Sequence, residues 1–355
     1  MNVRLVIPDL FWPDTVSAGP DATSIYADLA APAFERLAAR GRSTRHLAST
    51  LEAWLGDEFG LASDGELGPD LPAAPYTLLA DGVDPGDDFW MRADPACVDV
   101  ARETLLLADA ATFSLSRDEA DGFTASLSAH FAEDGITFIA PQPDRWYVRL
   151  QALPRMTTTP ITTARGRAVE AVLPQGPDAM RWQATMNEAQ MLLHMHPLNV
   201  AREARGEPMV NSVWFWGAGR IQPMKSNARL TVLADEPLAL GLARAARIGA
   251  QPLPADGLRF LDTAPQEGVA LIVLDLLRTP AAYGRAGEWR ERVELLDRLW
   301  LAPLLAALED GRIGMVTIHA PCEEFTLHVE TTRRDLRRLW RPFWRRRRSL
   351  ARYAS

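Results

Sequence analysis

Three short, almost uninterrupted apolar runs lie near the two ends of this chain, at residues 3–10, 269–275 and 314–320. Runs of this kind are typical of strands buried on both faces, as in a parallel sheet covered by helices. Helical patterns accompany them, among them 32–40, which ends at Gly41, and 288–308. The alternation predicts an α/β fold with a mostly parallel sheet flanked by helices.

The middle of the chain has a different pattern. Ser116 and Glu119 form a capping box that starts a helix, and two strand-like runs follow at 136–140 and 146–150. A stretch at 63–88 is rich in Gly, Pro and Asp and is expected to be a loop. We therefore predict an α+β module inserted into the sheet domain, with these boundaries: 1–88, first part of the core; 89–205, inserted module; 206–355, second part of the core.

Composition excludes some classes of protein. The net charge is −8, and no apolar run is long enough to span a bilayer, so no membrane span is expected. Two distant cysteines and no secretion signal indicate reduced thiols and a cytoplasmic location. Ten arginines at 333–352 favour either a helix docked on the acidic remainder or contact with an anionic partner. Arginine content alone does not indicate nucleic-acid binding.

The most specific local pattern lies in the second half of the chain. It consists of His196-Pro-Leu-Asn199, Arg202, Gly206, Pro208 and the run 211–219, NSVWFWGAG. In order and spacing this pattern resembles the central signature of the archaeal-type cofactor-independent phosphoglycerate mutases, in the alkaline phosphatase superfamily. The resemblance implies an alkaline-phosphatase-like fold. With the Arg/Trp-rich C-terminus, the chain looks most like the bacterial RpfE-type regulatory proteins of this group.

The reaction of that family implies a metal site. A Ser or Thr nucleophile transfers the phosphoryl group with the help of two divalent metal ions. By resemblance, the metal ligands that could remain here are Asp9, Asp275, His319 and His328. Ser24 is the candidate nucleophile, although the family's sequence context around it is absent.

At least two of the family's ligands are missing. Thr279 stands where a DxxxH pattern needs His, and Ile318 replaces the Asp of a DH pair. Each ligand fixes the geometry of a metal site, so these losses weaken it strongly. The alternatives are one weakened metal site or polar residues with structural roles.

A second set of residues could contact an anionic ligand. It comprises Arg202, Asn211, Arg220 and Lys225. Arginine and lysine bind phosphate or carboxylate groups. The alternative is that His196, Asn199, Arg202 and Asn211 form a polar network that fixes the junction of the inserted module.

These patterns favour a protein with little or no catalysis and no cofactor, which regulates or binds an unknown protein or a small phosphorylated ligand. The alternative is a metal-dependent phosphoryl-transfer enzyme, a phosphomutase or phosphatase, that uses Mn, Zn or Mg with an altered ligand set.

Overall fold

The computed structural model describes residues 1–13, 25–61, 70–101, 104–224, 226–264, 267–337 and 349–354. The chain divides into two compact units. The first unit comprises residues 1–55 and 226–355, and the second comprises residues 56–225.

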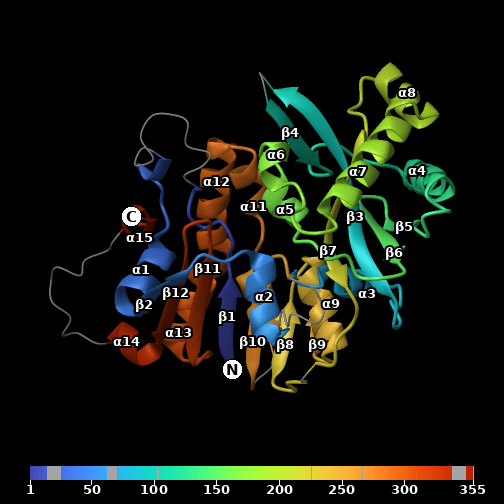
Figure 1. Cartoon of the computed structure of the whole chain (residues 1–355). Coiled ribbons are helices and arrows are strands. Elements are labelled where there is room, and N and C mark those ends of the chain that lie inside the picture. Colours follow the sequence, from blue (N-terminus) through green and yellow to red (C-terminus); the bar gives the residue numbers. More distant parts are fainter. Residues whose placement is uncertain are drawn as a thin grey trace. The chain divides into compact units, whose positions relative to one another are not determined.

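The first unit is built on a seven-stranded sheet in the order β2-β12-β11-β1-β10-β8-β9. Its strands are β1 (Asn2–Val6), β2 (Arg42–Leu47), β8 (Leu230–Leu233), β9 (Gly249–Gln251), β10 (Val269–Val273), β11 (Met315–Pro321) and β12 (Phe325–Thr332). β1 pairs in parallel with both β10 and β11, and β8 pairs in parallel with β10 and β9. β12 and β2 complete one side as antiparallel strands (Figure 1). The predicted mostly parallel sheet is confirmed.

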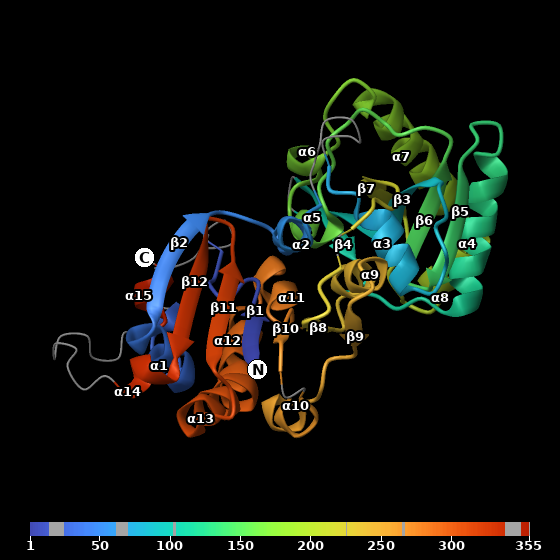
Figure 2. The same cartoon turned by 90° about the horizontal axis from the view of Figure 1, so that it is seen from below.

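Helices cover both faces of this sheet. They are α1 (Pro32–Arg40), α2 (Leu51–Phe59, of which residues 51–55 belong to this unit), α9 (Pro237–Ala245), α10 (Gly257–Thr263), α11 (Arg278–Ala282), α12 (Ala286–Leu296), the π-helix η3 (Asp297–Leu301), α13 (Ala302–Asp310), α14 (Arg333–Arg337) and α15 (Ala351–Ala354). α1, α12 and α13 lie on one face, where an apolar core forms, and α2 and α9 lie on the other (Figure 2).

The second unit contains a five-stranded sheet in which β4-β3-β6-β5 are neighbours and β7 also pairs with β3. Its strands are β3 (Phe89–Ala101), β4 (Thr104–Asp109), β5 (Thr137–Gln142), β6 (Arg145–Leu150) and β7 (Ser212–Gly219). Its helices are α3 (Ala73–Ala80), α4 (Arg117–His130), α5 (Ile161–Ala164), α6 (Val169–Val172), α7 (Ala179–His194) and α8 (Pro197–Ala204). This is an α+β arrangement.

The sequence predicts unit boundaries at 88/89 and 205/206. In the structure the boundaries fall at 55/56 and 225/226. Two elements account for the difference. β7 pairs with β3 over most of its length, and α3 packs against both strands. α3 also lies within the stretch expected to be a loop. Its sequence, AAPYTLLA, is mostly buried and apolar, so it lacks the one-sided periodicity that reveals a surface helix.

The sequence patterns that mark helix ends predict the structure more accurately than the domain boundaries. α1 covers the predicted residues and ends at Gly41. A Cβ at Gly41 would lie 2.3 Å from the Thr331 hydroxyl oxygen and 2.5 Å from the Glu330 carbonyl oxygen, so only glycine fits beside β12. The capping box at Ser116 and Glu119 is present at the start of α4.

The long helix expected at 288–308 is instead α12, η3 and α13 in succession. Pro303 lies in the first turn of α13 and has no N–H to donate to the turn before it. The π-helix occupies that turn, and such segments are often found at functional sites.

Among the described residues, no helix is long and apolar enough to cross a membrane. Cys97 and Cys322 are both buried and unbridged.

Candidate functional site

Two of the predicted ligands follow neighbouring strands in the first unit. β1 and β10 are paired in parallel, and Asp9 and Asp275 come shortly after their carboxyl ends. Open parallel sheets place their ligand sites at this edge. The backbone of Asp9 is held on both sides: its N–H donates to the Pro321 carbonyl at 3.0 Å, and its carbonyl accepts from the Trp289 indole at 2.9 Å. Asp9 has a φ of 56°, a left-handed conformation that few residues other than glycine adopt.

Arg278 places a positive charge beside these two carboxylates. It is the first residue of α11, and its backbone N–H donates to the Asp275 carbonyl at 3.1 Å. Its guanidinium donates to both carboxylate oxygens of Glu52, at 2.9 and 3.2 Å, and both side chains are buried. Burial by itself would lower the pKa of Arg278, but the charges of Glu52, Asp9 and Asp275 hold it above the ordinary value. Arg278 therefore stays charged.

A fourth carboxyl group completes this arrangement. Glu236 caps α9, where its oxygens accept from the N–H groups of Leu238 at 3.0 Å and Ala239 at 2.7 Å. Burial raises the pKa of Glu236 to about 7, and the charges of Glu52 and Asp275 act in the same direction. We call Asp9, Glu52, Glu236, Asp275 and Arg278 the carboxyl-edge cluster. It holds four acids and one cation, so it is acidic overall.

The two predicted histidine ligands form a separate pair. His319 and His328 are opposite each other on β11 and β12, with their Nδ1 atoms 3.4 Å apart. Trp54 of α2 packs against His319 with ring centroids 4.8 Å apart and the ring planes tilted by 53°. Burial lowers the pKa of His319 to about 3, and His328, Arg4 and His46 contribute to this shift. His319 is therefore neutral at pH 7, the form that binds metals. Its strongest electrostatic neighbours lie outside the carboxyl-edge cluster.

The donor chemistry of the cluster fits a divalent cation in part. Asp9 and Asp275 offer carboxylate oxygens, which Mg²⁺ and Mn²⁺ prefer. Across the described ranges, however, no group of three or more His, Cys, Asp or Glu has metal-binding geometry. Mg²⁺ is commonly held by only one or two carboxylates together with water and substrate phosphates. The described residues therefore supply part of a coordination shell.

The HPxN segment lies in the second unit, and its polar side chains bond internally. The amide of Asn199 donates to the Leu193 and Val210 carbonyls at 2.7 and 2.8 Å, and its oxygen accepts from the Val210 N–H. His196 caps α8 through the Leu198 N–H. These contacts tie α7, α8 and the start of β7 together.

Arg202 and Asn211 belong to the same structural region. The Arg202 guanidinium is 1% exposed and donates to the Pro208 and Ser114 carbonyls and to Glu119. The Asn211 side chain bonds the backbone of Val98 in both directions. Both residues therefore have structural roles, and a ligand contact by either stays a prediction.

The other candidates give less information. Arg220 is exposed and lies over the Phe89 ring, 5.4 Å from its centroid. Ser24, Lys225 and most of the arginine-rich tail lie outside the described residues.

Sequence reasoning did not single out three members of the carboxyl-edge cluster. Glu236 precedes Pro237, the usual pattern of a helix start, and this signal could have marked it as a buried cap. Arg278 follows Asp275 by three residues. Glu52 lies 226 residues from Arg278, and no local pattern indicates that the two meet.

Comparison with known proteins supports the resemblance seen in the sequence. No protein-family model matches the chain. A 2,3-bisphosphoglycerate-independent phosphoglycerate mutase of Methanosarcina mazei is 25% identical over 334 residues, which cover 86% of this chain and 81% of the relative. The corresponding protein of Methanosarcina acetivorans is 24% identical over the same length. A probable mutase of this kind from Geobacter sulfurreducens is 27% identical over 158 residues, 43% of this chain and 39% of the relative.

A solved structure with a TM-score above 0.5 has the same architecture. A protein from Pyrococcus horikoshii is 14% identical and superposes with a TM-score of 0.56 over 93% of this chain and 87% of its own. A cofactor-independent phosphoglycerate mutase from Thermoplasma acidophilum is 16% identical and superposes with a TM-score of 0.48 over 93% of this chain and 89% of its own. The fold is alkaline-phosphatase-like.

These relatives correct one expectation. The chain was expected to work without a cofactor, but the proteins it matches in sequence are phosphoglycerate mutases of the group whose reaction uses divalent metal ions. The expectation of no cofactor is therefore wrong.

Proposed function

We propose that this protein is a metal-dependent phosphoryl-transfer enzyme, a phosphomutase or phosphatase, with an altered set of metal ligands. The observation that carries the proposal is the position of Asp9 and Asp275 after two adjacent parallel strands, with the buried cation of Arg278 beside them. Relatives named as phosphoglycerate mutases along most of the chain support the same reaction class.

Asp9 and Asp275 would hold a divalent ion such as Mn²⁺, Zn²⁺ or Mg²⁺, which neutralises phosphate charge and activates a nucleophile when bound. Arg278 adds a fixed positive charge at the same edge, and Glu52 fixes its direction. A fixed cation in a buried site stabilises negative charge that develops during reaction, since no water has to reorient there. Ser24 remains the proposed nucleophile.

The ligand set is altered because Thr279 and Ile318 stand at two positions where the resemblance predicts metal ligands. His319 and His328 contact each other, which also supports an altered ligand set. We therefore expect one weakly held ion and slow turnover.

A direct test is an assay of the purified protein with 3-phosphoglycerate and with p-nitrophenyl phosphate, in EDTA and in titrations of Mn²⁺, Zn²⁺ and Mg²⁺. At least one substrate should turn over with at least one metal. Asp275→Asn should reduce that rate by about 10-fold or more, whereas Asp262→Asn, which changes an exposed carboxylate of α10, should not. Equal rates with and without metal, or no turnover at all, would refute the proposal.

A second candidate is a protein without catalysis that binds a small phosphorylated ligand or a partner protein, including the regulatory role of the RpfE-type proteins. The observation that favours it is Arg278, which already provides a cation among the carboxylates. Saturable binding of 3-phosphoglycerate in calorimetry, without turnover in any metal, would support this candidate over the first.

A further inference from the structure

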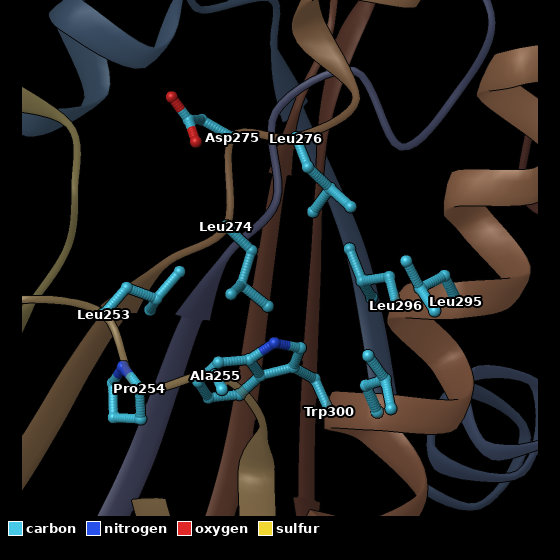
Figure 3. Close-up of a pocket in the computed structure, with 10 residues that line it drawn as sticks. Leu253, Pro254, Ala255, Leu274, Asp275, Leu276, Leu295, Leu296 and Trp300 are labelled. Carbon is cyan, nitrogen blue, oxygen red and sulfur yellow. The ribbon is translucent and has the colours of Figure 1, made fainter.

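An apolar pocket opens in the first unit beside the carboxyl-edge cluster. Its volume is about 170 Å³. It lies between the end of β10, the loop before α10, and the helices α12 and η3 (Figure 3). Its lining residues are Leu253, Pro254, Ala255, Leu274, Asp275, Leu276, Leu295, Leu296, Leu299 and Trp300. The lining is thus apolar except for Asp275, whose carboxylate points away from the pocket (Figure 3).

The size and lining of the pocket limit what it can hold. A cavity of about 150 Å³ lined by apolar side chains accepts a benzene-sized molecule. Leu276, Leu295 and Leu299 are half-buried, so the pocket is accessible from outside. Asp275 is the charged residue of the lining, and its carboxylate disfavours an anion. A neutral ring of about six heavy atoms therefore fits.

One polar group faces into this apolar space. Trp300 belongs to η3, and the nitrogen edge of its indole points into the pocket (Figure 3). Within the described residues, this indole N–H donates to no acceptor. Other buried tryptophans do have one: Trp289 donates to the Asp9 carbonyl at 2.9 Å, and Trp216 to Asp94 at 2.6 Å. Among the described residues, the Trp300 indole nitrogen is not one of the buried atoms left without a partner, so it is open to solvent in the pocket. An acceptor on a ligand would replace water as its partner.

We propose that this pocket is a binding site for a small neutral ligand. The ligand is a ring or branched group of benzene size that carries one hydrogen-bond acceptor, such as a carbonyl oxygen, which the Trp300 N–H binds. This site is distinct from the proposed phosphoryl-transfer site, because its lining has no cation for a phosphate and the Asp275 carboxylate points out of it.

The test compares two rings of nearly the same shape, cyclohexanone, which has an acceptor, and methylenecyclohexane, which has none. The ¹⁵N-labelled full chain is titrated with each, and the Trp300 indole N–H signal is assigned from its loss in Trp300→Phe. Cyclohexanone should shift this signal and bind about 2- to 10-fold more tightly than methylenecyclohexane, the range expected from one hydrogen bond.

Two variants separate the pocket from the donor. Trp300→Phe should bind both rings with equal affinity. Leu276→Trp should fill the pocket and abolish binding, whereas Leu258→Trp, at a position 58% exposed on α10, should leave it unchanged. If the Trp300 signal does not move at the solubility limit of cyclohexanone, or if the wild type binds both rings equally, the proposal is wrong. Each of these results is obtained without turnover, so it does not depend on the phosphoryl-transfer assay.

Discussion

Asp297 caps a helix from far along the chain: its carboxylate accepts the backbone N–H of Phe34, 263 residues away, at 2.7 Å. The other carboxylate oxygen accepts the Ala33 N–H at 3.1 Å. Ala31, the residue before α1, has no side chain that could cap the helix. Asp297 thus provides the cap and joins α1 to the π-helix. A carboxylate at a helix N-terminus also interacts favourably with the helix dipole.

We expect Asp297→Ala to lower the free energy of unfolding of the first unit by about 1–3 kcal/mol, because two buried N–H groups lose their acceptor. Urea denaturation followed by a probe in the first unit measures this. Asp297→Asn keeps one acceptor oxygen and should cost less. An Ala variant as stable as the wild type would contradict the capping role.

The Glu236 carboxyl group predicts a pH dependence of stability. Its pKa rises from 4.5 to about 7 on folding, so the folded state holds this proton more tightly than the unfolded state. The stability that this group contributes is therefore complete below pH 4.5 and is lost as the pH rises through about 7. A shift of this size corresponds to roughly 3 kcal/mol.

Unfolding curves of the wild type and Glu236→Gln, measured at pH values from about 4.5 to about 8, isolate this contribution. The difference in unfolding free energy between the two proteins should change across that range in the stated direction. Glu291→Gln, on the exposed side of α12, serves as the control and should follow the wild type. If the difference between the wild type and the Glu236→Gln variant stays constant with pH, the prediction is wrong.

The Arg278–Glu52 pair should be strongly coupled. Arg278→Gln leaves a buried carboxylate without its partner, which commonly costs about 3–5 kcal/mol. The double change Arg278→Gln with Glu52→Gln should recover part of that loss, since neither charge is then left alone. A double-mutant cycle in urea gives the coupling energy, and an additive result would show that the two side chains act independently.

Asn211 should matter for the stability of the second unit. Its side chain accepts from the Val98 N–H at 2.7 Å and donates to the Val98 carbonyl at 3.0 Å, which joins β7 to β3. Asn211→Ala should therefore destabilise this unit by about 1–3 kcal/mol. Asn227→Ala, which removes an exposed amide bonded to the nearby Arg229 N–H, should have a small effect. A melting temperature equal to that of the wild type would argue for a ligand-binding role instead.

The parts of the fold that could be predicted depend on local or periodic signals. The runs at 269–275 and 314–320 are strands because most of their residues are buried on both faces and are therefore mostly apolar. β2, with the sequence RSTRHL, was missed because it is a mostly exposed edge strand, where polar and charged side chains are common.

The candidate site is likewise predictable only where its residues follow a local spacing in the sequence. The nine-residue separation of His319 and His328 suits two strands joined by a short turn, and the two residues are indeed partners. The contact of Arg278 with Glu52 depends on how α2 packs against the sheet, which no spacing in the sequence records. The position of the Trp300 indole at the pocket likewise depends on a helix that changes to a π-turn.

The strand order also sets the sequence of events in synthesis. Among the described strands β1 leaves the ribosome before the others, yet both of its neighbours, β10 and β11, come from much later in the chain. At about 5–20 residues per second, β1 waits on the order of 10–50 s for β10. The second unit, continuous from 56 to 225, has all its strands by then. The nascent chain therefore carries β1 without its sheet neighbours while the strands of the second unit are already complete, and the sheet that holds the carboxyl-edge cluster is completed later.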